Sequence, residues 1–215
     1  MKTPHTVTLA FTGASGLPYG LRLLECLLGA QRRVYLVYSA AAMIVAKQEC
    51  DLVLPSQPRE ATRYFTERYS ARDGQLTVFG RDDWNAPIAS GSNAADAMAI
   101  CPCTVGALGA IAAGLAENLI ERAADVMLKE RRPLVLVPRE TPLSSIHLEN
   151  MLKLAHAGAV ILPPAPGFYD RPSSVADLVD FVVARVLDQL GVPHTLGPRW
   201  GEDRINDSST GTRSA

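Results

Sequence analysis

The chain has 215 residues, of which 47% are hydrophobic, and its formal net charge at pH 7 is -1. This length is typical of one domain, and the nearly balanced charge gives no indication of binding to nucleic acid or to an anionic membrane surface. No apolar run reaches the roughly 20 residues of a membrane span, and the first residues show no basic-then-apolar leader. We therefore expect a cytoplasmic protein.

The cysteines and histidines are scattered along the chain. This scatter is unlike a disulfide framework, and Cys101-Pro-Cys103 has no second ligand pair that would complete a zinc site. We expect reduced, mostly buried cysteines and no bound metal. The residues concerned are Cys26, Cys50, Cys101, Cys103, His5, His147, His156 and His194.

The first predicted strand, 7–12, leads into a glycine-rich turn, 13–16, and then into a helix with Pro18 in its first turn. Such a turn offers backbone N–H groups to a phosphate, although its glycines do not follow the GxGxxG pattern. The second strand, 33–38, ends in Ser39 rather than in the Asp or Glu that holds an NAD ribose. The sequence therefore argues against NAD and leaves room for a mononucleotide such as FMN.

Ser39 is expected to cap a helix over 40–50 that carries Glu49 in its last turn. Because a carboxylate is unfavourable at a helix C-terminus, Glu49 is either functional or simply exposed. A short helix over 60–69 and a strand over 76–79 follow. The small polar loop around Ser90 can bring backbone close to a ligand or can be an ordinary connection.

A further strand, 96–100, runs into Thr104–Ala107, where Thr104 can cap the next helix. This is a second strand-turn-helix junction of the phosphate-binding kind. Asn118-Leu-Ile-Glu121 resembles a capping box at the start of a helix that reaches Lys129. Arg122 shares a face of this helix with Lys129, and Asp125 between them can pair with Lys129 as part of a solvated face.

The apolar run Leu134–Val137 predicts a strand that is buried on both faces, as a central parallel strand is. It delivers Arg139 and Glu140 to the carboxyl end of the sheet, where open α/β folds bind ligands. These two residues form either a site or a surface ion pair.

The remaining predicted elements are a helix over 146–156, a strand over 159–162, a proline-rich loop ending at Tyr169, and a helix over 175–190. An apolar stripe of this last helix begins at Val175, and Arg185 lies at its margin. Strands alternating with helices predict a three-layer α/β domain with a mainly parallel sheet. We expect one domain over 1–190 and a tail over 191–215. In the tail, Trp200 would dock against another part of the protein, as a large aromatic residue usually does, and the residues from 207 onward would be disordered.

Several of these segments together resemble the UbiX-type flavin prenyltransferases, formerly called 3-octaprenyl-4-hydroxybenzoate carboxy-lyases. The resemblance covers about residues 5–190. It is carried by Thr12-Gly-Ala-Ser-Gly16, Asn118-Leu-Ile-Glu-Arg-Ala-Ala-Asp125, Lys129-Glu130, Arg139-Glu-Thr-Pro-Leu143, Ile146-His-Leu, Asn150-Met-Leu and the loop ending at Tyr169.

The resemblance implies a flavodoxin-like, Rossmann-like domain that binds FMN and assembles as a dodecamer. It implies the transfer of a dimethylallyl group from dimethylallyl monophosphate to N5 and then C6 of reduced FMN. The sequence has no Asp-Asp-x-x-Asp ligand motif of the pyrophosphate-using prenyl enzymes, so we expect the transfer to need no metal ion. Prenylated FMN would serve a UbiD-type decarboxylase, in bacteria usually within ubiquinone biosynthesis.

The resemblance also assigns residues. The FMN contacts it implies are Gly13, Ala14, Ser15, Ser39, Thr104, Val105, Gly106, Ala107 and Arg139. The pocket for the prenyl phosphate would comprise Ser90, Lys129, Glu140, Tyr169 and Arg185, with Arg122 from a neighbouring subunit. Glu140, Glu49 and Ser15 would handle protons, and the Trp200 ring would stabilise an allylic cation.

Two alternatives remain open. A flavin-dependent cysteine decarboxylase shares this fold, but it would have an early catalytic histidine and an Asn-Ala-Ala-x-Met-Pro-like motif, neither of which can be placed here. A flavin carrier without turnover would not need the basic residues of a second phosphate site.

Overall fold

The computed structural model describes residues 3–169 and 171–197. These residues form a six-stranded, entirely parallel sheet in the order β3-β2-β1-β4-β5-β6. The strands are β1 (Thr6–Phe11), β2 (Arg33–Tyr38), β3 (Leu76–Phe79), β4 (Ala97–Cys103), β5 (Leu134–Pro138) and β6 (Val160–Ile161). The order reverses between β1 and β4, and this is the position at which doubly wound sheets bind their ligands.

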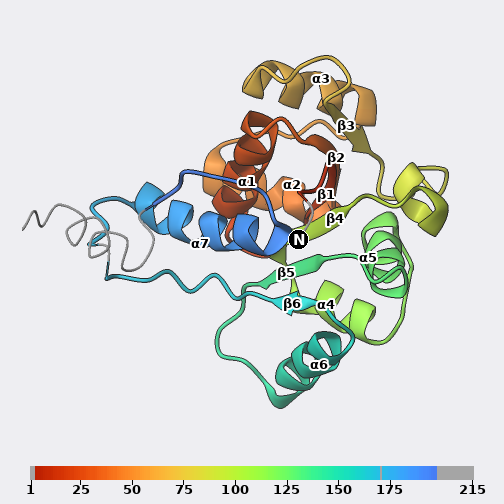
Figure 1. The fold of residues 1–215 in the computed structure, drawn as a ribbon, viewed down its shortest axis with the longest axis vertical. Helices are drawn as coiled ribbons and strands as arrows, with labels where there is room; N and C mark the ends of the chain where they lie inside the picture. Colours follow the sequence, from red (N-terminus) through yellow and green to blue (C-terminus); the bar gives the residue numbers. More distant parts are fainter. Residues whose placement is uncertain (1–2, 170, 198–215) are drawn as a thin grey trace, which may run out of the picture.

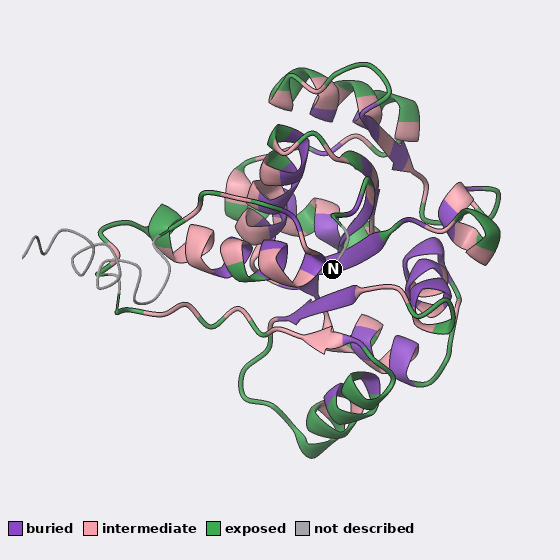
Figure 2. Ribbon diagram, viewed as in Figure 1, coloured by how far each residue is buried: buried purple, intermediate pink, exposed green. Residues whose placement is uncertain are grey.

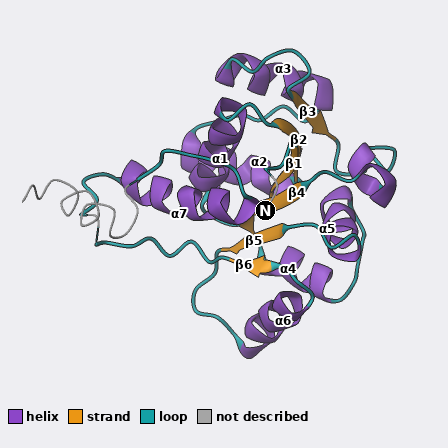
Figure 3. Cartoon of the chain, in the orientation of Figure 1, coloured by secondary structure: helices purple, strands orange, loops and turns teal. Residues whose placement is uncertain are grey.

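Helices cover both faces of the sheet (Figures 1 and 3). They are α1 (Leu17–Gly29), α2 (Ala40–Cys50), α3 (Pro58–Tyr69), α4 (Val105–Ala112), α5 (Leu119–Lys129), α6 (Ser145–His156) and α7 (Val175–Leu190), with short 3-10 turns η1 (Pro87–Ala89) and η2 (Gly91–Asn93). Helices α1, α2 and α7 contribute to one apolar cluster, and α4, α5 and α6 to the other. The predicted three-layer α/β class is confirmed.

Side-chain alternation along the strands builds the two clusters. In β1, Val7, Leu9 and Phe11 face the α1 and α7 side, whereas Ala10 faces the opposite side. All five residues of β5 are buried, as expected for a strand covered on both faces (Figure 2). The central strands therefore hold the following loops in fixed positions at the carboxyl edge of the sheet.

Local capping signals set most helix starts. The hydroxyl groups of Ser39 and Thr104 accept hydrogen bonds from backbone N–H groups of α2 and α4, and Asn118 Oδ1 caps α5 in the same way. The capping-box prediction for α5 is only half right. Glu121 accepts a hydrogen bond from the backbone N–H of Glu117 instead of returning to Asn118.

Three other expectations need correction. Strand β6 has two residues, so the predicted strand over 159–162 is too long, and β4 continues to Cys103, three residues past the predicted end. Val175, expected on the buried stripe of α7, is exposed.

Among residues 3–169 and 171–197, no helix combines the length and apolar character needed to cross a membrane.

Candidate functional site

Thr12 joins the two loops that flank the reversal of strand order. Its hydroxyl donates to the carbonyl oxygen of Pro102 at 2.8 Å and accepts from the backbone N–H of Thr104 at 2.8 Å. Because Thr12 is buried, water competes little with these bonds. The glycine-rich turn after β1 and the start of α4 are therefore held side by side.

The starts of α2 and α4 at this edge offer backbone N–H groups to an anion. A Cβ atom on Gly13 would lie 2.4 Å from Ala41 Cβ, so the turn after β1 can approach α2 only with glycine at this position. At the start of α4, the nearest atom to a Cβ on Gly106 would be Thr104 Oγ1, at 4.0 Å. The turn after β1 is thus packed closely on α2, whereas the start of α4 is open, and we call this arrangement the cradle.

Glu49 lies beside this cradle, and its contacts explain its unfavourable place in the last turn of α2. Its carboxylate accepts hydrogen bonds from the backbone N–H groups of Gly16 at 2.9 Å and Leu17 at 3.0 Å. A carboxylate that is poorly placed at the end of one helix thus stabilises the start of another, α1. It also lies next to Ser15, its expected partner.

Arg139 and Glu140 follow β5 but point to different partners. Arg139 Nε donates to the carbonyl oxygen of Ser15 at 3.1 Å, so this side chain reaches over the turn after β1. Glu140 is exposed, and its carboxylate accepts a hydrogen bond from the backbone N–H of Thr141. The ion pairs among the described residues include none between Arg139 and Glu140.

Arg122 and Lys129 lie along α5 against the loop that contains Ser90. Arg122 Nε donates to the carbonyl oxygen of Ala89 at 2.9 Å, and Lys129 Nζ would lie 2.6 Å from a Cβ atom on Gly91. The expected pairing of Asp125 with Lys129 is wrong. Asp125 pairs with Arg122, an i,i+3 neighbour, at 2.8 Å instead, and Lys129 pairs with Glu130.

Lys129, at the end of α5, lies away from the carboxyl edge. Lys129 precedes β5 and Arg139 follows it, so the length of a five-residue strand, about 16 Å, separates their backbones. In Figure 1 the segment around residues 87–93 lies to the right of the sheet, whereas α7 lies to the left. In these positions Lys129 pairs with Glu130 beside the Ser90 loop, whereas Arg139 reaches the carbonyl oxygen of Ser15, so the two cations face different parts of the chain.

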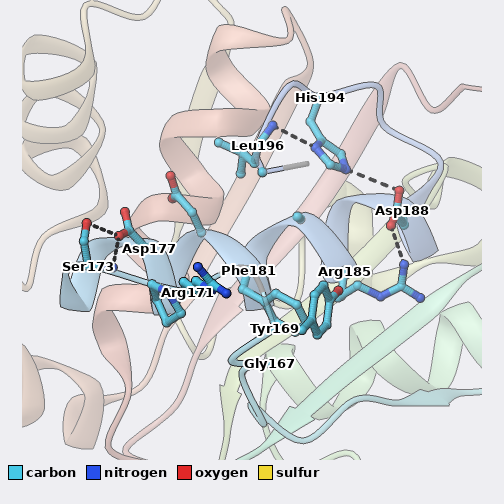
Figure 4. A pocket seen from close by; sticks show the side chains of 14 residues that line it. Gly167, Tyr169, Arg171, Ser173, Asp177, Phe181, Arg185, Asp188, His194 and Leu196 are labelled. Atoms are coloured by element: carbon cyan, nitrogen blue, oxygen red, sulfur yellow. Dashed lines mark hydrogen bonds and ion pairs between the residues drawn. The ribbon is translucent and has the colours of Figure 1, made fainter. Parts of the chain in front are cut away.

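Tyr169 and Arg185 line a third region, a cavity of about 650 Å³ between α7 and the loops on either side of it (Figure 4). The Tyr169 ring packs edge-on against Phe181 with ring centroids 5.7 Å apart. Arg185 Nη1 pairs with Asp188 Oδ2 at 2.7 Å. The other lining residues are Gly167, Arg171, Pro172, Ser173, Asp177, Asp180, Ala184, His194, Leu196 and Gly197.

Comparison with known proteins gives consistent matches over most of the chain. A family profile described as Flavoprotein matches residues 1–187. The flavin prenyltransferase UbiX of Pseudomonas aeruginosa is 60% identical over 205 residues, which cover 95% of this chain and 98% of the relative. The chain belongs to the UbiX flavin prenyltransferase family.

Solved structures of similar proteins agree with this assignment. AnUbiX, solved in complex with FMN and dimethylallyl pyrophosphate, aligns with a TM-score of 0.81 at 41% identity and covers 92% of this chain and 97% of its own. The dodecameric FMN-dependent UbiX-like decarboxylase of Escherichia coli O157:H7 aligns with a TM-score of 0.80 at 41% identity, covering 91% of this chain and 98% of its own. The expected family and the flavodoxin-like fold are confirmed.

For a member of the flavin prenyltransferase family, the predicted site residues fall into three groups within one chain. The first group lies at the carboxyl edge of the sheet and comprises the expected FMN contacts, among them Arg139, together with Glu49 and Glu140. The second group lines the cavity beside α7 and comprises Tyr169 and Arg185. The third group lies on the α5 side and comprises Ser90, Arg122 and Lys129. Trp200 lies outside the described residues.

Sequence reasoning missed Asp188 and His194, which lie in the cavity beside Arg185. Asp188 lies in the last turn of α7, where the helix dipole disfavours a negative charge, as it does for Glu49 in α2. This pattern could have identified Asp188 from the sequence. Sequence reasoning also missed Trp84, a large aromatic residue that is 50% exposed and lies in the loop leading to Ser90. Tryptophan side chains are buried on average, so a half-exposed one can indicate a contact surface.

The cysteines take no part in these groups. All four are free thiols, and Cys101 and Cys103 are buried. Burial raises the pKa of Cys26 to about 11 and the pKa of Cys103 to about 12, so these thiols stay protonated at neutral pH and are poor nucleophiles. Within residues 3–169 and 171–197 there is also no group of three or more His, Cys, Asp or Glu side chains suited to a metal ion.

Proposed function

We propose that this chain prenylates FMN, transferring a dimethylallyl group from dimethylallyl monophosphate to the reduced flavin. The near-full-length match to flavin prenyltransferases carries the proposal. The cradle at the reversal of strand order supports FMN as the cofactor, since it offers helix N-termini and has Ser39 where NAD-binding proteins have an acidic residue. The cysteine decarboxylase and carrier alternatives have no comparable support.

We assign FMN to the cradle at the carboxyl edge. The starts of α2 and α4 would bind its phosphate through backbone N–H groups together with the hydroxyl groups of Ser39 and Thr104. Arg139, which already reaches the turn after β1, would lie between the flavin and the leaving phosphate. The remaining proposed FMN contacts are Gly13, Ala14, Ser15, Val105, Gly106 and Ala107.

The prenyl phosphate requires cations and hydrogen-bond donors where negative charge grows as the C–O bond breaks. Tyr169, Arg185 and Arg139 can supply these from one chain. Because Ser90, Arg122 and Lys129 lie on the α5 side, we propose that they complete the site of a neighbouring copy. Assembly as a dodecamer, the state of the Escherichia coli relative, would provide that neighbour.

Bound reduced FMN supplies the nucleophilic N5 and the ring carbon C6 that form the two new bonds. The chain must then hold protons and exclude water. Glu140 can give a proton to the leaving phosphate or accept the proton that C6 loses when the second bond forms. Glu49 beside Ser15 can move a proton near N5. Trp200 is proposed to close over the prenyl group as part of a tail, 191–215, that follows the flavoprotein domain of residues 1–190.

The downstream role is also a proposal. Prenylated FMN would pass to a UbiD-type decarboxylase, and the UbiX relatives suggest ubiquinone biosynthesis as one pathway that uses it. A cytoplasmic location stays a prediction.

Release of inorganic phosphate tests the proposed reaction. Purified protein with dimethylallyl monophosphate should release one phosphate per flavin when FMN is reduced, and none when FMN is oxidised, since only reduced N5 is nucleophilic. Phosphate release that is independent of the flavin redox state would indicate a phosphatase and contradict the proposal.

Gly13→Ala should lower FMN affinity by tenfold or more, because its Cβ atom would lie 2.4 Å from Ala41 Cβ and push the turn after β1 away from α2. Isothermal titration with FMN measures this loss. Gly29→Ala is the matched control, since a Cβ there has no neighbour within 4 Å. Equal FMN affinity in the two variants would show that the close approach at Gly13 is not needed for binding.

A further inference from the structure

The cavity beside α7 has a rigid floor. Arg22 of α1 holds Asp180 of α7 through two hydrogen bonds, Nε to Oδ1 at 2.7 Å and Nη2 to Oδ2 at 3.1 Å. Val183 and Leu187 on the opposite side of α7 are fully buried in the core. The position of α7 is therefore fixed, and the walls of the cavity come from Gly167, Tyr169 and residues 171–173 on one side and from His194, Leu196 and Gly197 on the other.

Asp188 occupies a poor position for the helix itself. It lies in the last turn of α7, where the helix dipole disfavours a negative charge. Its carboxylate instead accepts from two groups of the cavity: Arg185 Nη1 at 2.7 Å and His194 Nε2 at 3.3 Å (Figure 4). These contacts offset the unfavourable position of Asp188 at the end of the helix.

His194 connects the segment that follows α7 to Asp188. Its Nδ1 atom accepts a hydrogen bond from the backbone N–H of Leu196 at 3.1 Å, so in the neutral ring the proton is on Nε2, which faces Asp188. The side chain is only 9% exposed. One imidazole thus fixes the course of residues 194–196 and anchors them to α7.

We propose that Asp188 and His194 are positioning residues for substrate capture: Asp188 holds Arg185 at the cavity, and His194 holds residues 194–197 as a wall over the bound phosphate group. This inference rests on the proposed prenyl transfer. Arg185 is 55% exposed, and a free arginine side chain loses rotamer freedom when it binds. The hydrogen bond to Asp188 pre-orders it through Nη1 and leaves other guanidinium donors for a phosphate.

The test compares His194→Ala with His194→Gln and Thr195→Ala in the full-length protein. Dimethylallyl monophosphate is varied at saturating reduced FMN, and FMN affinity is measured separately. Gln can donate from its side-chain amide to Asp188 as the ring does, and Thr195 is an exposed neighbour that does not line the cavity. We expect His194→Ala to raise KM for the monophosphate about tenfold, the factor typical of a hydrogen bond to a charged group.

The same variant should leave kcat and FMN affinity unchanged. His194→Gln should bring KM most of the way back to the wild-type value, and Thr195→Ala should behave as wild type. In an Asp188→Ala background, His194→Ala should have a much smaller effect, because the two residues act through one contact. An unchanged KM, equal effects of His194→Ala and Thr195→Ala, or additive effects with Asp188→Ala would overturn the inference. If the wild-type protein makes no prenylated FMN, the proposed function fails and the inference fails with it.

Discussion

Glu140→Gln is expected to slow FMN prenylation by roughly 10²–10⁴-fold, the range that general acid–base catalysis contributes, while FMN affinity stays the same. The side chain is exposed, and its carboxylate contacts the backbone N–H of Thr141 and forms no ion pair with Arg139. A glutamine keeps this hydrogen-bond acceptor and the shape of the side chain, so the substitution removes proton transfer without disturbing the cradle.

Single-turnover rates with pre-reduced FMN measure the effect, and titration with FMN measures binding. Glu149→Gln on α6 is the matched control, because Glu149 is also an exposed carboxylate and lies outside the three groups of site residues. Loss of FMN affinity in Glu140→Gln would make the residue structural, and wild-type turnover would remove it from the chemistry.

Lys129→Ala and Arg139→Ala should each nearly abolish turnover, yet together they should restore activity when the two variants are co-expressed and assemble into one oligomer. If each site takes Arg139 from one chain and Lys129 from another, random assembly of equal amounts leaves about a quarter of the sites intact. The distance along β5 between the two residues is the reason for this expectation. Differently tagged chains allow the mixed oligomers to be purified before phosphate release is measured.

Co-expression of Lys129→Ala with Arg122→Ala provides the control. Both residues lie on α5 beside the Ser90 loop, so every chain in this mixture carries a damaged α5 side and activity should not return. Recovery in the control, or none in the mixture of Lys129→Ala and Arg139→Ala, would show that the α5 side does not act on a neighbouring copy.

Local signals predicted much of the fold. The observed bounds of α2 and α7 equal the predicted ones, because Ser39 and Asp51 fix the ends of α2 and Gly191 adopts a left-handed conformation at the end of α7. The apolar run in β5 predicted a strand buried on both faces, and the absence of polar residues made that prediction secure. These features depend on neighbours a few residues away.

The candidate site depends on contacts between distant segments, which spacing cannot show. Glu49 finds its partners in α1, more than 30 residues earlier, and Arg139 reaches Ser15 rather than the adjacent Glu140. Local reasoning also paired Asp125 with the wrong cation, since i,i+3 and i,i+4 partners are equally available on a helix surface. The division into a carboxyl-edge part and an α5 part became visible only once the parallel sheet was in place.

The mass of the flavin after reaction tests the central claim most directly. The protein is incubated without oxygen with reduced FMN and dimethylallyl monophosphate, and the flavin is released and weighed by mass spectrometry. We predict a product heavier than FMN by one five-carbon prenyl unit, formed by the wild-type protein and lost together with phosphate release in Lys129→Ala. A flavin of unchanged mass under these conditions would contradict the assignment of this chain as a flavin prenyltransferase.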